Sequence, residues 1–307
     1  MTDNSSKYKY GKIQSMTSPT PELVLDAKAQ LGEGPCWDGE TQTLYWINIY
    51  AGEIHAFSPE TGSDRVIPVG EPVGCLAPTK AGALVIASQS GISLLSPETG
   101  LRKLLTHPES HLPGNRFNDG KCDPAGRFLA GTMDNAEKEA SGSLYSLSPD
   151  GTLKTLLTGV RISNGLAWSP DHATLYYIDT PTRTVMAFAY DLATGDISQP
   201  RKSIHIQDGM GWPDGMTSDT EGNLWIAMWG GAALTKWDPA MGRLLQTIPI
   251  PALNVTSCAF GGESLTDLYI TSARKGVSED QLSQYPLTGA VFRLRMDVKG
   301  MPTFTFG

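Results

Sequence analysis

Asp214, between Pro213 and Gly215, is the acidic side chain of this sequence best placed for chemistry. By itself a Pro-Asp-Gly triplet is ordinary turn chemistry. It gains meaning because an equivalent position precedes each of six β-rich segments by ten or eleven residues. These six positions, called the ring positions below, hold Glu33, Val73, Asn118, Asn164, Asp214 and Ser257. We expect the four that carry a carboxylate or an amide to meet in space and form an active site.

Two carboxylates and two amides in one place would favour a metal ion. Glu33 and Asp214 would repel each other, and burying them costs free energy unless a cation compensates their charges. Asn118 and Asn164 add neutral oxygen ligands, and neither cysteine nor histidine belongs to the set. Oxygen ligands suit a hard cation. We therefore predict one divalent ion, Ca²⁺ in the first place, with Mg²⁺, Mn²⁺, Zn²⁺ and Fe²⁺ as alternatives.

Each of these residues also has a purely structural interpretation. Asp214 could be a turn residue, Asn164 precedes a glycine in a strong turn dipeptide, and Glu33 could be a solvated loop charge. Arg116 and Lys121, near Asn118 in the sequence, could equally be ion-pair partners that only stabilise the fold. The recurrence of ligand-type side chains at one repeat position favours a shared site over these separate explanations.

Internal repeats must position these side chains. Six β-rich runs follow turns, and a third and a fourth short strand follow each run. This pattern predicts an all-β fold, a six-bladed β-propeller with four-stranded antiparallel blades. A tandem of two sandwiches would not predict six units of one kind. The anchor residues of the runs are Leu44, Leu84, Phe128, Leu175, Leu224 and Leu268, at spacings of 40, 44, 47, 49 and 44.

The first strand of each blade lines the central channel of a propeller, so the ring positions should surround one mouth of that channel. Glycines at 34, 74, 165 and 215, one residue after a ring position, and at 120, two residues after one, would let neighbouring backbones approach closely. A propeller must also close on itself. We expect residues 22–26 to add a strand to the last blade, formed by residues 268–294.

Composition limits the classes of partner. The chain has 307 residues and a net charge of -8, which argues against a nucleic-acid partner. Residues 1–20 are polar and do not resemble a signal peptide, and the chain contains no apolar run of about eighteen residues. We therefore expect a disordered tail over 1–20, a propeller domain over 21–307, no membrane partner, a cytoplasmic location, and a monomer or small homo-oligomer.

The cysteines do not form a metal or redox motif. No two of them are close in sequence, and without an export signal we expect all four to be reduced and buried. They are Cys36, Cys75, Cys122 and Cys258.

Several longer motifs carry a family resemblance. The chain from about residue 21 to 295 resembles the gluconolactonase and regucalcin (senescence marker protein) family, with the motifs in the family's order. The matching motifs are Leu31-Gly-Glu33-Gly-Pro35-Cys-Trp37, Arg116-Phe-Asn118-Asp-Gly120-Lys, Asp123-Pro-Ala-Gly126, Ser163-Asn164-Gly165-Leu-Ala-Trp168, Pro213-Asp214-Gly215 and Thr256-Ser-Cys258-Ala-Phe.

The resemblance implies a six-bladed propeller that hydrolyses sugar lactones with one catalytic divalent ion. Glu33, Asn164 and Asp214 would be the metal ligands, and Arg116 and Asn118 would bind substrate. The chain departs from the family after Gly131-Thr-Met133. Regucalcin-like members carry a further sugar-binding glutamate there, whereas this chain has an alanine at 136, with Asp134 and Glu137 nearby. Which of these two acids faces the substrate is open.

The chemistry of lactone opening fits this residue set independently. A metal would polarise the carbonyl, and Asp214 would act as general base on the attacking water. Trp212 could wall a sugar pocket or pack in the core, and segments 106–115 and 203–212 are candidate lids. Three other functions remain: a metal-dependent aryl-ester or organophosphate hydrolase, a calcium-binding regulatory propeller without turnover, and a protein-interaction propeller.

Overall fold

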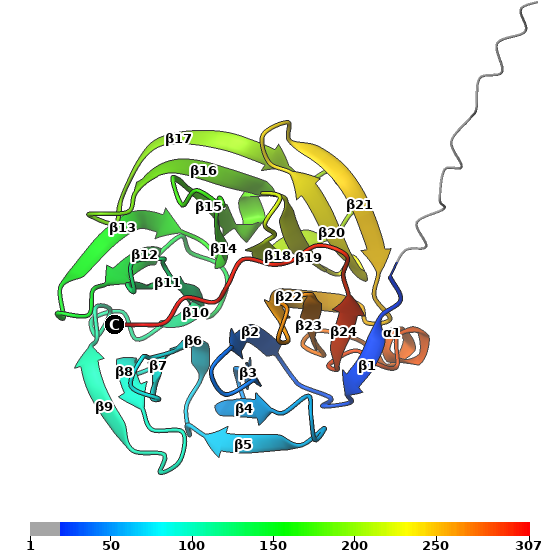
Figure 1. Ribbon diagram of the computed structural model, residues 1–307, viewed down its shortest axis with the longest axis horizontal. Helices are drawn as coiled ribbons and strands as arrows, with labels where there is room; N and C mark the ends of the chain where they lie inside the picture. Colours follow the sequence, from blue (N-terminus) through cyan, green and yellow to red (C-terminus); the bar gives the residue numbers. More distant parts are fainter. Residues whose placement is uncertain (1–18) are drawn as a thin grey trace, which may run out of the picture.

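The fold is a closed ring of six antiparallel sheets with four strands each, as Figure 1 shows for the computed structural model. The structure describes residues 19–307, so the tail expected at the N-terminus lies almost wholly outside the described residues. The prediction of a six-bladed β-propeller is confirmed. Two short helices complete it, the 3₁₀ helix η1 (Thr180–Thr182) and α1 (Glu279–Gln284). No helix within residues 19–307 combines the length and apolar character needed to cross a membrane.

The strands follow the chain blade by blade. Blade 1 contains β2 (Gly32–Asp38), β3 (Thr43–Asn48), β4 (Glu53–Phe57) and β5 (Asp64–Pro68); blade 2 contains β6 (Val73–Pro78), β7 (Leu84–Ser88), β8 (Gly91–Leu95) and β9 (Arg102–Thr106). Blade 3 contains β10 (Asn115–Cys122), β11 (Phe128–Asp134), β12 (Gly142–Leu147) and β13 (Leu153–Val160); blade 4 contains β14 (Ser163–Trp168), β15 (Thr174–Asp179), β16 (Thr184–Asp191) and β17 (Asp196–His205). Blade 5 contains β18 (Trp212–Ser218), β19 (Leu224–Trp229), β20 (Ala233–Asp238) and β21 (Arg243–Pro249); blade 6 contains β22 (Asn254–Gly261), β23 (Asp267–Ala273), β24 (Val291–Arg295) and β1 (Glu22–Leu25).

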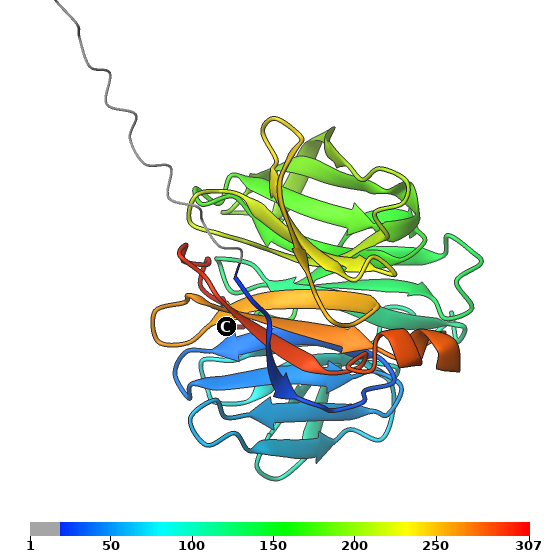
Figure 2. The ribbon, with the colours of Figure 1, turned by 90° about the vertical axis from the view of Figure 1, so that its right-hand side faces the viewer.

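The N-terminal strand closes the ring as predicted. β1 pairs antiparallel with β24, with Glu22 opposite Arg293. Arg293 Nη2 lies 2.6 Å from Glu22 Oε2, which adds an ion pair to the strand pairing. Figure 2 shows β1 beside β24 in this blade. Closure leaves no long unpaired inner edge, which is the way a propeller avoids edge-to-edge association.

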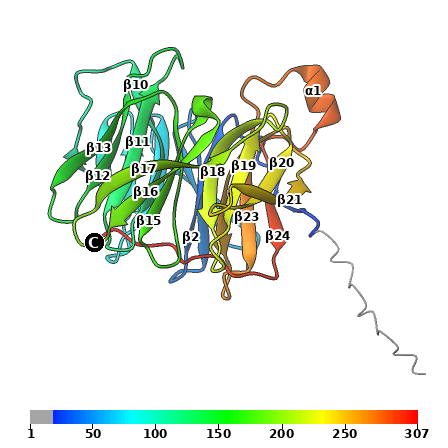
Figure 3. The same cartoon turned by 90° about the horizontal axis from the view of Figure 1, so that it is seen from above.

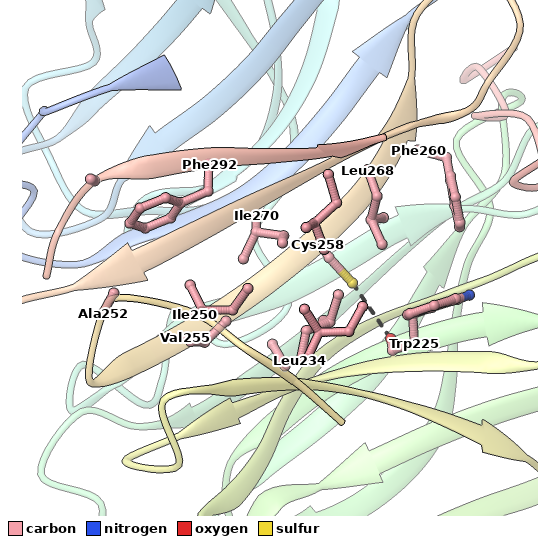
Figure 4. Packing of buried hydrophobic residues seen from close by; sticks show 14 residues of the cluster. Trp225, Leu234, Ile250, Ala252, Val255, Cys258, Phe260, Leu268, Ile270 and Phe292 are labelled. Atoms are coloured by element: carbon pink, nitrogen blue, oxygen red, sulfur yellow. Dashed lines mark hydrogen bonds between the residues drawn. The ribbon is translucent and has the colours of Figure 1, made fainter. Parts of the chain in front are cut away.

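The core lies between blades, because each sheet buries both faces of its inner strands. All residues of β6 and β7 are buried, whereas the outermost strand β9 is mostly exposed. Figure 4 shows the packing between blades 5 and 6, where Trp225, Leu234, Ile250 and Phe292 belong to one apolar cluster. Apolar contact between neighbouring blades is therefore the main source of stability.

The cysteines are unpaired, as expected. Cys75, Cys122 and Cys258 are buried, and Cys36 is partly buried. Burial raises the pKa of the Cys36 and Cys258 thiols to about 12, so both remain protonated at neutral pH.

Close approach of the inner strands requires glycine, as predicted. A Cβ on Gly215 would lie 2.1 Å from Ser257 Oγ in blade 6, and one on Gly74 would lie 2.4 Å from the Phe117 carbonyl oxygen in blade 3. One on Gly165 would lie 2.9 Å from the Asp214 carbonyl oxygen. The register between the first two strands of every blade also shifts at the ring position. Such bulges re-aim side chains, here toward the channel.

The C-terminal segment, residues 299–307, closes the other end of the channel. Met301 N donates to Ser218 O at 3.1 Å in blade 5, and Gly307 N donates to Gly126 O at 3.1 Å in blade 3. The segment therefore crosses the middle of the ring (Figure 1), and it lies on the face opposite to α1 (Figure 3). Beneath it remains a cavity of about 50 Å³, lined in part by Lys121 and Phe304. The channel therefore opens on the face that carries α1.

Candidate active site

The predicted site residues meet in one pocket. Glu33, Asn118, Asn164 and Asp214 lie on the innermost strands of blades 1, 3, 4 and 5, and together with Arg116 they line a pocket of about 910 Å³. The other two ring positions, Val73 and Ser257, are buried but do not line it. α1 lies on the face opposite to the C-terminal segment (Figure 3), and its residue Gln281 borders the pocket. The pocket therefore opens on the face that carries α1.

A chain of hydrogen bonds connects three blades around the pocket floor. Arg116 Nη1 donates to Asn118 Oδ1 at 2.6 Å, and Asn118 Nδ2 donates to Asn164 Oδ1 at 2.9 Å. Asn164 Nδ2 donates to Thr180 Oγ1 at 2.8 Å, and Thr180 Oγ1 donates to Pro213 O at 2.8 Å. Thr180 engages the amide nitrogen of Asn164, and the carbonyl oxygen of Asn164, which accepts from Asn118, keeps a second lone pair for a ligand. This series of hydrogen bonds ends at Pro213, the residue before Asp214.

Asp214 is buried without a partner. Its side chain is 5% exposed, and within residues 19–307 its carboxylate makes no hydrogen bond or ion pair within 4.0 Å. Burial, and then the negative charge of Glu33, raise the pKa of Asp214 well above its usual range. Glu33 accepts a hydrogen bond from Gly34 N at 2.9 Å, and burial followed by the charge of Asp119 raises its pKa to about 8. Two adjacent carboxylates in such an environment require a counter-charge.

Asp119 is a further buried carboxylate that acts electrostatically on Glu33 and Asp214, and sequence reasoning missed it. It is 8% exposed and accepts a hydrogen bond from Gly120 N at 2.7 Å. Burial raises the pKa of Asp119, and the charge of Lys121 opposes this. Asp119 does not line the pocket, yet its charge raises the pKa values of both Glu33 and Asp214. It follows Asn118 directly in a family-like motif, and that position was the only sequence signal for it.

The residues present fit a divalent cation with oxygen ligands. Within the described residues, no cluster of three or more histidine, cysteine, aspartate or glutamate side chains forms a metal site. The candidate set instead combines two carboxylates, Glu33 and Asp214, with the amide oxygen of Asn164. Within residues 19–307 the Asp214 carboxylate has no partner, and the pKa values of Glu33 and Asp214 are raised. A bound cation would pair with these carboxylates and lower both pKa values.

The structure shows which of the two acids, Asp134 or Glu137, faces the pocket. Asp134 accepts hydrogen bonds from the backbone N–H groups of Ala136, Lys138 and Glu139, which lower its pKa, and it does not line the pocket. Glu137 lines the pocket and forms an ion pair with Lys275 from blade 6. Glu137 is therefore the acid that faces the pocket.

Tyr50 and Asn135 both contact the Arg116 side chain and hold it in place. Asn135 Oδ1 accepts from Arg116 Nε and from Tyr50 OH, each at 3.1 Å. The Tyr50 ring centre lies 5.4 Å from the Arg116 guanidinium and 5.4 Å from Lys275 Nζ. Lys121, by contrast, donates to Met216 O at 2.9 Å and faces the small cavity at the other end of the channel.

Trp212 forms part of the pocket rim. Its side chain lines the pocket, is 41% exposed, and lies under the Arg183 guanidinium at 3.9 Å. Segment 203–212 thus borders the pocket, through Gly209, Gly211 and Trp212. Segment 106–115 contributes no residue to it, and Glu109 in that segment is fixed by Asn115, Thr132 and Tyr145. The structure does not support a lid at 106–115.

Comparison with known proteins places the chain in a family. The sequence model described as SMP-30/Gluconolactonase/LRE-like region matches residues 31–274. The chain belongs to this family.

Individual members are similar over almost their whole length. Regucalcin of Danio rerio is 38% identical over 295 residues, which are 95% of this chain and 99% of that protein. A putative sugar lactone lactonase of Bacillus subtilis, YvrE, is 37% identical over 284 residues, with 92% and 97% covered. The crystal structure of a protein of Agrobacterium tumefaciens, described as a calcium-binding protein, regucalcin, superimposes with a TM-score of 0.90 at 31% identity, covering 94% and 98%.

Membership of the SMP-30/gluconolactonase family agrees with the resemblance inferred from the motifs. The residues on which the motifs depend, Glu33, Arg116, Asn118, Asn164 and Asp214, line one pocket. Their separate roles as metal ligands, base and substrate contacts stay predictions. Asn135, Lys275 and Tyr50 had no repeat signal in the sequence, because each reaches the site from a loop between strands.

Proposed function

We propose that this protein hydrolyses sugar lactones with a divalent ion held by Glu33, Asn164 and Asp214. The observation that carries the proposal is the Asp214 carboxylate, which is buried, has no partner among residues 19–307, and lies in one pocket with Glu33 and Asn164. Membership of a family named for gluconolactonase and the similarity to a putative sugar lactone lactonase support the reaction class. The similarity to a protein described as calcium-binding supports Ca²⁺ as the first candidate ion.

The reaction consumes one water molecule. Water adds to the acyl carbon, the bond from that carbon to the ring oxygen breaks, and the ring oxygen takes up a proton. The resulting carboxylic acid ionises, so each turnover at neutral pH releases one proton. When bound, a divalent cation would supply Lewis-acid polarisation of the carbonyl and the counter-charge that keeps Asp214 ionised.

The chain's own residues divide the remaining tasks. Asp214 takes the proton of the attacking water at its carboxylate, and its ionised form is the one that can do so. Arg116 and Asn118 bind the hydroxyl and ring oxygens of the sugar, because a polyol needs several fixed polar partners. Asn135 and Tyr50 hold the Arg116 guanidinium in place for this task. Trp212 offers an apolar face at the rim.

Hydrolysis of a panel of lactones by metal-stripped protein tests the proposal. Glucono-, xylono-, galactono- and arabinonolactone are each supplied in weak buffer, single divalent ions are added back, and proton release is measured above the spontaneous rate. Activity restored by an ion is the expected result. Absence of turnover with every ion and every lactone would refute the proposal.

The same experiment separates two other functions. An ion that raises the melting temperature without supporting turnover would favour a calcium-binding regulatory propeller; the A. tumefaciens protein is described as calcium-binding. Hydrolysis of aryl esters in place of sugar lactones would favour an ester hydrolase that uses the exposed Trp212 rim.

A further inference from the structure

The lining of the pocket concentrates positive charge on an acidic protein. The chain has a net charge of -8, yet four cationic side chains line this one pocket: Arg116, Arg161, Arg183 and Lys275. Three carboxylates also line it: Glu33, Asp214 and Glu137. Glu33 and Asp214 belong to the proposed metal site, where a divalent ion would neutralise them. The cations therefore outnumber the carboxylate that remains, Glu137.

Three of the four cations are engaged by the protein itself. Arg116 is bound to Asn118 and Asn135, and Lys275 is paired with Glu137. Arg183 is bound through the backbone of segment 203–212. Its Nη1 donates to Gly211 O at 2.9 Å and to Gln207 O at 3.3 Å, its Nε lies 3.4 Å from Asp208 Oδ1, and its guanidinium covers the Trp212 ring. These groups shape the pocket wall.

Arg161 is the exception. Within residues 19–307 its guanidinium makes no hydrogen bond and no ion pair, and the residue is exposed at the pocket. Asp179 is an acid close to Arg161, but its carboxylate accepts hydrogen bonds from two backbone N–H groups. These are the N–H of Arg161, at 3.2 Å, and the N–H of Ile162, at 2.9 Å. Burial raises the pKa of Asp179, and the charge of Arg161 only opposes this shift. The Arg161 side chain is thus a charged donor available to a ligand.

The backbone of Arg161 is fixed relative to the reacting end of the pocket. Asp179, which binds the Arg161 amide, directly precedes Thr180, and Thr180 binds both Asn164 and the Pro213 carbonyl. Arg161 and the proposed metal ligand Asn164 therefore belong to the same wall, at the top of blade 4. A substrate held at Asp214 would extend toward this wall.

We propose that the substrate of this site is a lactone that carries a second anionic group outside its ring, and that Arg161 binds that group. This inference rests on the function proposed above. A neutral aldonolactone offers only hydroxyl groups and would leave the Arg161 charge unused. A guanidinium pairs well with a carboxylate or a phosphate, the two anions that sugars commonly carry. The pocket volume of about 910 Å³ is near the upper end of the range for small-ligand sites, about 300–1,000 Å³, and leaves room for the extra group.

Matched lactones test the inference directly. The substrates are glucono-1,5-lactone, which is neutral, the monolactone of glucaric acid, which adds a carboxylate, and glucono-1,5-lactone phosphorylated on its exocyclic oxygen. The variants are Arg161→Gln and, as control, Arg243→Gln. Arg243 begins the outer strand β21, is exposed and does not line the pocket, and within the described residues its side chain makes no hydrogen bond or ion pair.

We expect the wild-type protein to prefer one of the two anionic lactones over the neutral one in kcat/KM, and the better anion identifies the group as carboxylate or phosphate. Arg161→Gln should lower kcat/KM for that lactone about 10-fold, mainly through KM, which is the effect of removing a charge-assisted hydrogen bond. The neutral lactone should change less than about twofold. Added salt should reduce the preference, because the rim charge is solvent-accessible. A neutral lactone as good as both anionic ones, or equal losses on all three, would refute the inference and leave the proposed lactonase function intact.

A binding measurement separates the two proposals if no lactone is hydrolysed. Calorimetric titration of the Ca²⁺-loaded protein with D-glucarate and with D-gluconate compares a dianion with a monoanion of the same length. Tighter binding of D-glucarate, lost in Arg161→Gln and kept in Arg243→Gln, supports the anion site even when the hydrolytic function fails. Equal affinities for the two acids in the wild-type protein would overturn it.

Discussion

Removal of divalent ions should make this protein less stable as the pH rises, and Glu33 should be a main cause. In the metal-free protein the pKa of Glu33 is about 8, against 4.5 for an unperturbed glutamate. Between these values the folded chain holds a proton that the unfolded chain has lost. The contribution of Glu33 to stability is therefore largest below about pH 4.5, and it is lost as the pH rises toward 8.

The size of this effect follows from the pKa difference. Each pKa unit corresponds to about 1.4 kcal/mol, so the full window is worth about 5 kcal/mol, and the part between pH 5 and pH 8 about 3 to 4 kcal/mol. Substitution Glu33→Gln removes the titrating group and the repulsion of Asp214. We expect the metal-free variant to lose less stability between pH 5 and pH 8 than the metal-free wild-type protein, while the titration of the buried Asp214 remains in both.

Urea unfolding at pH 5, 6.5 and 8, in a chelator, measures this difference. Glu40→Gln is a suitable control, because Glu40 is exposed in the turn after β2 and its side chain makes no hydrogen bond or ion pair within the described part of the chain. Its pH profile should be parallel to that of the wild-type protein. With Ca²⁺ present, the wild-type protein should gain more stability at pH 8 than at pH 5, because ion binding must displace the proton of Glu33. Parallel profiles of Glu33→Gln and wild type in chelator would refute the reasoning.

Three further perturbations address the base, the inner ring and the C-terminal segment. Asp214→Asn should reduce kcat for lactone hydrolysis by at least about 100-fold, and retention of more than a few per cent of activity would remove Asp214 from the mechanism. Gly215→Ala should cost about 1–3 kcal/mol or more in urea unfolding, because its Cβ would collide with Ser257. Gly114→Ala, whose Cβ would have no atom within 4 Å, should be near neutral. Equal effects of the two substitutions would contradict the close approach of the strands at Gly215. Deletion of residues 299–307 should lower the melting temperature by several degrees, since Phe306 is buried and the segment joins blades 2, 3 and 5; an unchanged value in calorimetry would show that the segment does not stabilise the ring.

The sequence by itself determined the architecture and the inner ring of the site. Short strands at a spacing near 45 residues are a local signal, repeated six times, and a closed propeller is the arrangement that buries them all. Because side chains alternate along a strand and every blade places its first strand at the channel, the repeat alone assigns Glu33, Asn118, Asn164 and Asp214 to one mouth of the channel. The pairing of β1 with β24 followed from the same need for closure.

Tertiary structure alone decided how the loops complete the site. Glu137 faces the pocket and Asp134 does not, because the Asp134 carboxylate is used by the backbone of its own turn. Lys275 reaches Glu137 across the pocket from another blade, over a sequence separation of 138 residues. Arg161 is available to a ligand only because Asp179 is engaged by backbone amides. No periodic pattern encodes such contacts, since they depend on loop conformations and on the docking of distant blades, whereas the ring positions follow from the repeat itself.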